Sequence, residues 1–537
     1  MSRLPAPFNE PVETYAPGTA ARSRLLDALS SMSKETVEIP VIAGPIEQRT
    51  GNVLDVVMPH RRRQVIARAH EAGPEETQAA IDAAMAIAPA WAETPFEERA
   101  AIFLRAADLL SGPWRARINA ACMLGQSKTP HQSEIDAVAE LADFWRWNVH
   151  FYEEIEKHQP SSPHGTWNRL EMRPLEGFVL AITPFNFLSI AANLPTAPIL
   201  GGNVCVWKPA TTSLLGAWHL MQLLREAGLP EGVLSMLPGR GASQSEVALA
   251  SPHLAGIHFT GSTGTFKHLW RKVSENLDRY RSFPRLVGET GGKDFVIAHA
   301  SADPAALATA ISRGGFEYQG QKCSAASRIY VPRSLWPEVR DRVIGDLGHM
   351  KMGDVSDFSV FLGAVIDDRA FARIRGYQEL AKTSANVLFG GGNNDTEGYF
   401  IEPTLVQVDD PKHRLMEEEI FGPLVTCFVY DDARYGETLE LVDRTSPYGL
   451  TGAVFARDSI ALAEADRTLR NAAGNYYVND KPTGAVVGQQ PFGGARASGT
   501  NDKAGSMFNL IRWISPRTIK ETFVPPTDWR YPYLSEG

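Results

Sequence analysis

Three side chains carry the groups that covalent catalysis needs. Cys323 lies in GQKCSAAS, between a predicted helix and a predicted strand, where a loop presents residues to a cleft. A cysteine thiolate is a strong nucleophile, and the neighbouring Lys322 can favour that charged form. Glu289 lies in VGETGGKD, and a carboxylate beside such a cysteine can activate water to hydrolyse an acyl-enzyme. Asn186, in AITPFNF, can donate a hydrogen bond to an oxyanion.

Each of these residues also has a non-catalytic interpretation. Most single cysteines are small buried hydrophobes. A Glu in a glycine-rich turn is usually solvated, and a turn Asn usually caps the helix that follows. Gly288, Gly291 and Gly292 indicate a tight backbone or a positive φ around Glu289. Taken singly, none of the three residues establishes catalysis.

The segment IHFTGSTGTFKHLW holds the best candidate for a phosphate-binding turn. A strand runs into Gly261, Ser262, Thr263 and Gly264, and a Gly/Ser turn at a helix N-terminus can face a pyrophosphate. An ordinary βα turn explains the segment equally well, and no G-x-G-x-x-G follows a predicted strand. Lys208 ends a strand in VWKPATTS and can bind ribose hydroxyls, although a lone lysine is more often solvated.

Short apolar runs alternate with helical segments from about residue 178 onward. The predicted strands are FVLAI (178–182), NVCVW (203–207), VLSMLPG (233–239), AGIHFTG (255–261), FVIAH (295–299), SRIYVP, GPLVTCFVY, TGAVFA and GNYYVND. One predicted helix ends at Gly228, and another runs from the N-cap Asp303 to Gly314. This alternation predicts parallel βαβ units, and 537 residues require at least two domains.

The composition argues against several classes of protein. A formal charge of −9 gives no electrostatic footprint for nucleic acid, and the run Arg61-Arg62-Arg63 is interpreted as a solvated loop. Proline and asparagine interrupt the apolar stretch 178–207 too often for a membrane span. Four widely spaced cysteines form no disulfide or metal pattern, so we expect no metal and a reducing compartment. The N-terminus has no targeting pattern, which favours the cytoplasm.

Several motifs, taken together and in order, resemble the aldehyde dehydrogenase superfamily. They are PFNF, WKP, FTGS, ETGGK, GQKCS, EEIFGP and PFGG, between residues 184 and 494. Further stretches resemble one branch, the L-glutamate γ-semialdehyde dehydrogenases, also called Δ1-pyrroline-5-carboxylate dehydrogenases. They include FKHLW, FPRL, FEYQGQKCSA, YGLTGAVF, LRNAAGN and VGQQPFGGARASGTNDK. With AADLLSGP and SEIDAVAEL added, the resemblance runs over most of the chain.

The resemblance implies an α/β fold with two open parallel-sheet domains and a β-flap for oligomerisation. One domain is a variant Rossmann domain that binds NAD, and the other is catalytic. We expect the first at 1–158 and 178–288 with an N-terminal helical wrap, the second at 289–500, and the flap at 159–177 and 501–537. The implied state is a homodimer or an assembly of dimers that acts on a small molecule.

The implied roles fall on residues that match the motifs. Cys323 attacks an aldehyde, Asn186 and the Cys323 backbone N–H hold the oxyanion, and Glu289 activates the hydrolytic water. The implied cofactor contacts are Thr183, Lys208, Gly261, Ser262, Thr263, Gly264, Thr265, Glu419 and Phe421. The implied substrate contacts are Phe187, Ser324, Gly484, Ala485 and Phe492, with Lys322 and Glu140 as further pocket members. Glu140 is otherwise a solvated helix residue.

The implied reaction is NAD-dependent oxidation of L-glutamate γ-semialdehyde, formed from Δ1-pyrroline-5-carboxylate, to L-glutamate in proline catabolism. Backbone N–H donors at Gly484 and Ala485 would grip the substrate carboxylate and discriminate chain length by geometry. The alternatives are another semialdehyde, acyl transfer to coenzyme A, or a non-catalytic protein that kept the fold. Many superfamily members have Glu three residues after the cofactor lysine, but this chain has Thr211, so exclusion of NADP is not implied.

Overall fold

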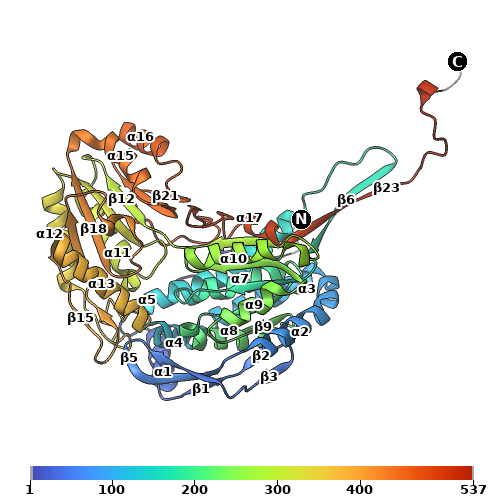
Figure 1. The fold of residues 1–537 in the computed structure, drawn as a ribbon, viewed down its shortest axis with the longest axis horizontal. Helices are drawn as coiled ribbons and strands as arrows, with labels where there is room; N and C mark the ends of the chain where they lie inside the picture. The colour runs from blue at the N-terminus through green and yellow to red at the C-terminus, as the bar shows by residue number, and fades with distance from the viewer. Residues whose placement is uncertain (1–3, 535–537) are drawn as a thin grey trace.

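Two seven-stranded sheets, each covered by helices, form the body of the protein (Figure 1). The computed structural model describes residues 4–534. The first sheet has the order β11-β10-β7-β8-β9-β2-β3, and its strands from β11 to β9 are parallel. These strands are β2 (Val41–Ala43), β3 (Ile46–Gln48), β7 (Phe178–Ile182), β8 (Val204–Lys208), β9 (Leu234–Met236), β10 (Leu254–Thr260) and β11 (Arg285–Glu289).

The order of strands in the first sheet reverses at β7. The chain moves from β7 to β8 and β9 on one side, and then returns to β10 and β11 on the other. Ligands of open parallel sheets bind beside the carboxyl ends of the strands at such a switch point. Thr183, Lys208 and Gly261 lie at the carboxyl ends of β7, β8 and β10. The topology therefore gathers the predicted cofactor residues at one edge.

The second sheet has the order β14-β17-β18-β13-β12-β20-β21, and every strand except β14 is parallel to its neighbours. Its strands are β12 (Asp294–Ala298), β13 (Ala326–Pro332), β14 (Asn386–Phe389), β17 (Thr404–Val408), β18 (Leu424–Tyr430), β20 (Thr451–Phe455) and β21 (Asn475–Val478). The chain crosses from one sheet to the other between β11 and β12. Glu289 is the last residue of the first sheet before that crossing.

Helices cover the sheets, and several begin or end as the sequence predicts. Asp303 caps α11 by accepting from the Ala305 and Ala306 N–H groups, and α8 ends at Gly228, which has a φ of 102°. The helices are α1 (Ala20–Met32), α2 (Pro74–Glu93), α3 (Phe96–Ser111), α4 (Arg115–Gln126), α5 (Pro130–Ser133), α6 (Leu141–Glu156), α7 (Leu188–Leu200), α8 (Leu214–Ala227), α9 (Ala242–Ala250), α10 (Thr263–Glu275), α11 (Pro304–Phe316), α12 (Trp336–His349), α13 (Asp368–Ser384), α14 (Arg414–Glu417), α15 (Tyr435–Arg444), α16 (Ser459–Thr468) and α17 (Met507–Leu510). A π-helical segment, η1 (Glu134–Glu140), precedes α6.

A long two-stranded arm projects from the body (Figure 1). Strand β6 (Thr166–Pro174) pairs antiparallel with β23 (Ile514–Thr522) over its whole length, from Ile514 opposite Pro174 to Thr522 opposite Thr166. These strands lie inside the ranges predicted for the flap. Residues 535–537 at the end of the predicted flap, and residues 1–3 at the start of the predicted NAD-binding domain, lie outside the described residues.

The N-terminal part departs from the sequence interpretation in two ways. Residues 37–70, for which no element was predicted, form strands: β1 (Val37–Ile39), β4 (Val53–Met58) and β5 (Arg61–His70) make a small sheet, while β2 and β3 join the first large one. The interpretation of Arg61-Arg62-Arg63 as a solvated loop is wrong, because these residues begin β5. Arg61 and Arg62 pair with Asp354 and Asp395 instead of facing water alone.

The predicted fold class is confirmed by two open, mainly parallel sheets with helical layers and a β-arm. Within residues 4–534, no helix combines the length and the apolar character that crossing a membrane requires. One core cluster surrounds the first sheet, and two others lie on the faces of the second. The site is built where the two sheets meet.

Candidate active site

The loop after β7 presents Asn186 to the second sheet. Thr183 is fixed at its start, because its N–H donates to the Lys208 carbonyl (3.2 Å) and its hydroxyl accepts from Trp207 Nε1 (2.9 Å). Asn186 is buried, and its Nδ2 donates to the Gln321 carbonyl (3.1 Å), two residues before Cys323. Asn186 thus spans the gap between the two sheets. It does not cap α7, whose N-cap residue is Phe187.

Cys323 lies at the end of a strained and tightly held loop. Tyr318 and Gln319, in the short helix η4 (Glu317–Gly320), have φ values of 51° and 55°, a left-handed conformation that costs energy outside glycine. The Gln319 amide donates to the carbonyls of Ser127 and Ala364, and the Gln321 side chain accepts from the Ile366 N–H (3.0 Å). Gln321, Lys322 and Ser324 are buried around Cys323, which is itself half-buried.

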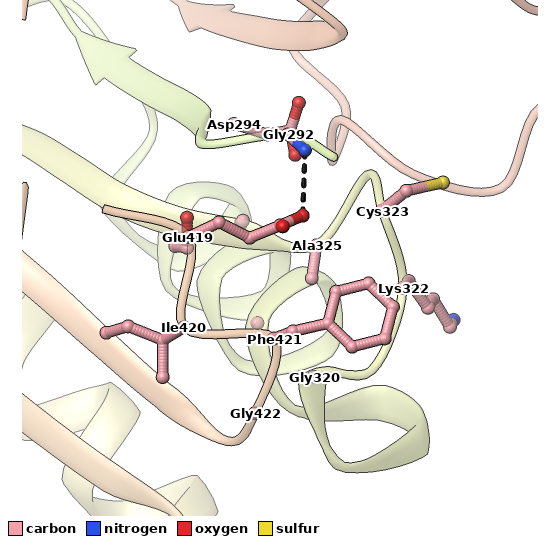
Figure 2. Close-up of a pocket in the computed structure, with 13 residues that line it drawn as sticks. Gly292, Asp294, Gly320, Lys322, Cys323, Ala325, Glu419, Ile420, Phe421 and Gly422 are labelled. Atoms are coloured by element: carbon pink, nitrogen blue, oxygen red, sulfur yellow. Dashed lines mark hydrogen bonds between the residues drawn. The ribbon is translucent and has the colours of Figure 1, made fainter. Parts of the chain in front are cut away.

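The surroundings of Cys323 disfavour its thiolate in the ligand-free protein. Burial raises the pKa of the thiol well above 9, and the negative charges of Asp294, Glu289 and Glu419 raise it further. The expectation that Lys322 favours the thiolate is not met, because its ammonium lies 3.0 Å from Glu317 and is neutralised there. Figure 2 shows the side chains of Cys323 and Lys322 leaving their loop on the side away from Glu419. The thiol is therefore protonated at neutral pH.

Glu289 is a half-buried carboxylate whose charge acts on the Cys323 thiol. Burial raises its pKa well above 4.5, against a hydrogen bond that its Oε2 accepts from the Gly494 N–H (3.1 Å). The glycines around it allow close approach rather than a positive φ. A Cβ at Gly292 would lie 2.3 Å from the Cys323 carbonyl oxygen, and one at Gly291 would lie 2.4 Å from the Glu419 carboxylate. The expectation of tight backbone geometry holds, and no positive φ occurs at these positions.

A small cavity lies beneath the nucleophile loop (Figure 2). Its volume is about 10 Å³, which is room for roughly one water molecule. Cys323, Asp294, Glu419 and Phe421 are among the residues that line it. Glu419 Oε1 accepts from the Gly292 N–H (2.9 Å), so this carboxylate is oriented from the start of β12. Asp294 was not singled out from the sequence; its Oδ2 is buried without a hydrogen-bond partner among the described residues.

The carboxyl edge of the first sheet fits a dinucleotide. Ser262 caps α10 by accepting from the Thr265 N–H (3.1 Å), so the predicted turn at a helix N-terminus is confirmed. Lys208 is largely buried, its ammonium has no ion-pair partner within the described chain, and burial lowers its pKa to about 8. An anionic or hydroxyl-rich ligand would satisfy that ammonium. Thr211, at the start of the next helical turn, carries no charge that would repel a 2′-phosphate.

The predicted substrate residues lie on loops that meet next to Cys323. The Ser324 hydroxyl lies 2.8 Å from that of Thr483, directly before Gly484, which has a φ of 93°. The N–H groups of Gly484 and Ala485 have no acceptor among the described residues, so a carboxylate can bind them. Phe492 is held by backbone hydrogen bonds with Ala504.

Glu140 and Phe187 lie near one another at the start of α7. Glu140 Oε2 lies 2.7 Å from the Ser189 hydroxyl, and burial raises the pKa of Glu140 to about 8. Glu140 is thus half-buried and hydrogen-bonded to Ser189, and its place in the substrate pocket stays a prediction. Behind the Phe187 ring, at 4.4 Å from its centroid, lies the ammonium of Lys128. The sequence analysis missed Lys128 and its partner Asp136; their only signal was charge within an otherwise buried helical stretch.

Comparison with known proteins adds an independent line of evidence. The family model described as "Aldehyde dehydrogenase family" matches residues 46–518. A relative named mitochondrial Δ1-pyrroline-5-carboxylate dehydrogenase from Dictyostelium discoideum is 48% identical, over 99% of this chain and 96% of the relative. The Bos taurus protein of the same name is 50% identical, over 98% of this chain and 94% of its own.

Solved structures agree with these relatives. The Δ-pyrroline-5-carboxylate dehydrogenase of Mycobacterium tuberculosis, bound with NAD, superposes with a TM-score of 0.96 at 53% identity, over 100% of this chain and 99% of that one. The 1-pyrroline-5-carboxylate dehydrogenase from Thermus, also with bound NAD, has a TM-score of 0.92 at 30% identity, over 97% of this chain and 100% of that one.

Proposed function

The chain belongs to the aldehyde dehydrogenase family, and from this premise we propose that it oxidises L-glutamate γ-semialdehyde to L-glutamate with NAD in proline catabolism. The aldehyde is the open form of Δ1-pyrroline-5-carboxylate, for which its full-length relatives are named. One observation carries the proposal: a thiol, a carboxylate and an amide meet where the two sheets join. Asn186 contacts the loop of Cys323, and the charge of Glu289 acts on the Cys323 thiol.

Cys323 performs the first step. Its thiol first loses its proton to water; the thiolate sulfur then forms a bond to the aldehyde carbon, and the C=O electron pair moves to the oxygen, which becomes the oxyanion of a thiohemiacetal. The Asn186 Nδ2–H and the Cys323 backbone N–H hold this oxyanion, because both donors sit on anchored loops. Since burial and nearby carboxylates raise the pKa of the thiol, formation of this bond becomes faster as the pH rises.

The edge at the switch point would hold NAD. Lys208 and Glu419 would bind ribose hydroxyls, Thr183 would contact the cofactor through its backbone, and Phe421 would lie beside the nicotinamide ribose. The turn from Gly261 to Thr265 would face the pyrophosphate at the start of α10. When bound, NAD accepts the hydride that leaves the substrate carbon, and the acyl group remains on Cys323 as a thioester.

Glu289 carries out the second step. Its carboxylate takes a proton from water, the water oxygen attacks the thioester carbon, and the C–S bond breaks to release L-glutamate. The Gly494 N–H orients the carboxylate for this task. Because its pKa is raised, Glu289 is a stronger base than an exposed glutamate once it is deprotonated.

The pocket selects an aldehyde of the correct length through its contacts with the end of the substrate that carries the carboxylate. The unpaired N–H groups of Gly484 and Ala485, with the Ser324 hydroxyl, bind the substrate carboxylate, and Phe187 and Phe492 flank its methylenes. A site built to hydrogen-bond a polar group rejects a ligand that lacks it, because its donors are left unpaired. Glu140 and Lys322 complete the pocket.

A substrate panel tests the proposed function. Δ1-pyrroline-5-carboxylate is expected to give a kcat/KM at least about 100-fold above that of unbranched aliphatic aldehydes, since these leave the carboxylate donors unpaired. NADH or NADPH formation is followed at 340 nm with each cofactor. NAD is the preferred cofactor, and NADP supports slower turnover because Thr211 is uncharged. Equal rates on all aldehydes, or a requirement for coenzyme A, would overturn the assignment.

We assign the domains in the same way. The NAD-binding domain comprises residues 1–158 and 178–288, the catalytic domain comprises residues 289–500, and the flap comprises residues 159–177 and 501–537. The structure describes residues 4–534 of this chain. The crossing between the sheets after Glu289 supports the boundary between the first two. We also place the protein in the cytoplasm. Support comes from its cysteines, which are all unpaired, whereas several relatives are named mitochondrial.

The arm supports a dimer. A two-stranded ribbon is marginally stable alone, and large apolar side chains are exposed on it and on the tail beyond, including Trp167 (50%), Phe523 (62%) and Trp529 (81%). Such patches mark interfaces. The edge strand β21, where Val478 is half exposed, offers unpaired backbone groups to a second copy of the chain.

Truncation distinguishes the arm from the tail. A chain that ends at Ile514 lacks β23 and is expected to be a monomer, whereas a chain that ends at Phe523 keeps β23 and stays dimeric. Analytical ultracentrifugation reads the mass of both. If the shorter chain sediments as the full-length protein does, the arm is not the interface.

A further inference from the structure

A buried ion pair lies directly behind the loop that carries Asn186. The Lys128 ammonium is 2.5 Å from Asp136 Oδ2, and the two side chains are only 1% and 0% exposed. Lys128 follows α4 and Asp136 belongs to η1, so neither residue is on the sheets that supply the site. Because removing two charges from water is costly, a pair in this position needs further hydrogen-bond partners.

Asp136 finds these partners at the first turn of α7. Its Oδ2 accepts from the Leu188 N–H (3.1 Å), and its Oδ1 accepts from the Ser189 N–H (3.0 Å). Phe187, the N-cap residue, provides no side-chain cap. Asp136 therefore caps α7 across space, where unpaired N–H groups and the helix dipole favour a negative charge.

The Asp136 cap fixes the chain just after Asn186, and one further contact fixes it just before. On the other side, Gln126 Nε2 donates to the Phe185 carbonyl. Only Asn186 and Phe187 lie between these two anchors, and the Asn186 amide points to the Gln321 carbonyl. The position of the amide is thus set by contacts from α4 and η1, which themselves touch none of the reacting atoms in the proposed mechanism.

Lys128 also connects the Asp136 cap of α7 to the loop that carries the nucleophile Cys323. Its ammonium lies 4.4 Å from the centroid of the Phe187 ring and 4.6 Å from that of Tyr318. Phe187 follows Asn186, and Tyr318 belongs to the strained turn that leads to Cys323. One buried cation therefore contacts both loops through cation–π interactions.

The π-helical segment extends the network to the substrate pocket. The Ser189 hydroxyl lies 2.7 Å from both Asp136 Oδ1 and Glu140 Oε2. A hydroxyl has one hydrogen, so it can donate to only one carboxylate, and the other must donate to it. Burial, together with the charge of Asp136, raises the pKa of Glu140 to about 8, so the shared hydroxyl couples the two carboxyl groups.

We propose that Asp136, neutralised by Lys128, is a positioning residue for the Asn186 amide, which it holds in place by capping α7. The inference rests on the proposed function, since it requires Asn186 to stabilise the oxyanion. Asp136 accepts hydrogen bonds from the start of α7 and pairs with Lys128, and it acts on the reacting atoms only through Asn186. Its effect on catalysis must therefore disappear when the amide is absent.

A double-mutant cycle tests this dependence. Asp136→Asn keeps an oxygen for Ser189 but removes an acceptor from the Leu188 N–H and the counterion from Lys128. With Asn186 present, this change is expected to lower kcat about 100-fold, with the KM for NAD changed by less than about threefold. In the Asn186→Ala background it is expected to lower kcat by no more than about twofold.

The outcomes separate this inference from the proposed function. If Asn186→Ala leaves kcat unchanged, the oxyanion role in the proposed function fails. If both single changes lower kcat and their effects multiply in the double variant, Asp136 acts independently of the amide and the inference is overturned. Asp143→Asn is the matched control, because Asp143 lies on the adjoining α6 and, within residues 4–534, accepts only from Asn9 and the Glu10 N–H. It should retain kcat.

A second variant tests the inference even if Asp136→Asn fails to fold. Asp136→Asn alone leaves Lys128 buried and unpaired, which destabilises the folded protein. Lys128→Met with Asp136→Asn removes both charges and leaves no buried ion. The kcat of this paired variant is compared with that of the parent, with Asn186 present and in the Asn186→Ala background. The inference requires the paired change to lower kcat only when Asn186 is present. If the paired change and Asn186→Ala lower kcat by factors that multiply, the inference is refuted.

Discussion

Replacement of Cys323 by serine is expected to lower kcat by about 10⁴-fold or more, because an alcohol is a far weaker nucleophile than a thiol at neutral pH. The buried surroundings of residue 323 already disfavour an anion, and a hydroxyl is much harder to ionise there than a thiol. No other side chain in the small cavity beneath it is a nucleophile of comparable strength. Steady-state NADH formation measures the loss, and a thermal melt shows that the variant is folded.

The other cysteines provide the control for this prediction. Cys427 is buried in β18, where a reagent cannot reach its sulfur, whereas Cys323 is half-buried. Cys427→Ala is therefore expected to keep its activity and its reaction with a small alkylating agent. Cys323→Ser should lose both. Turnover by Cys323→Ser at more than about one hundredth of the parent rate would exclude Cys323 as the nucleophile.

Replacement of Glu289 by glutamine is expected to separate the two halves of the reaction. Acylation continues and gives a burst of one NADH per site, while the steady-state rate falls about 100-fold to 10⁴-fold, the usual contribution of a general base. A glutamine Oε1 can still accept from the Gly494 N–H, so the fold around it is retained. Stopped-flow absorbance resolves the burst from the slow phase.

The pH profile gives a second measurement of Glu289. Its pKa is raised, mainly by burial, so the base form is lost as the pH falls through a value well above 4.5. The deacylation rate of the parent should therefore fall on the acid side of that value, and Glu289→Gln should lack this limb. An unchanged steady-state rate in the variant, or an unchanged acid limb, would remove Glu289 from its assigned role.

Local patterns predicted much of the framework. The apolar runs at 178–182 and 203–207 are β7 and β8, and Ser262 caps α10 as the Gly/Ser turn suggested. These features succeed because a short apolar run, a cap and a turn act over a few neighbouring residues. The small sheet of β1, β4 and β5 was missed, because its strands mix exposed and buried residues and carry arginines that pair only in the folded chain.

Long-range contacts account for what the patterns could not show. Lys322 was expected to assist Cys323, but Glu317 pairs with it at 3.0 Å. Glu140 was open between a pocket member and a solvated residue; in the fold it is half-buried and hydrogen-bonded to Ser189, 49 positions away. Asp136 lies in SEIDAVAEL, a stretch that contributed to the resemblance but assigned this residue no role. Its importance appears only when a residue 52 positions away begins a helix against it.

The sequence by itself determined which groups are available for chemistry and which local elements carry them, because residue type and short-range spacing are properties of neighbouring residues. The tertiary structure decided which of these groups meet and in which protonation state. Desolvation and the charges of distant residues set a pKa, and both exist only after two sheets, a π-helical segment and the crossing after Glu289 have brought them together.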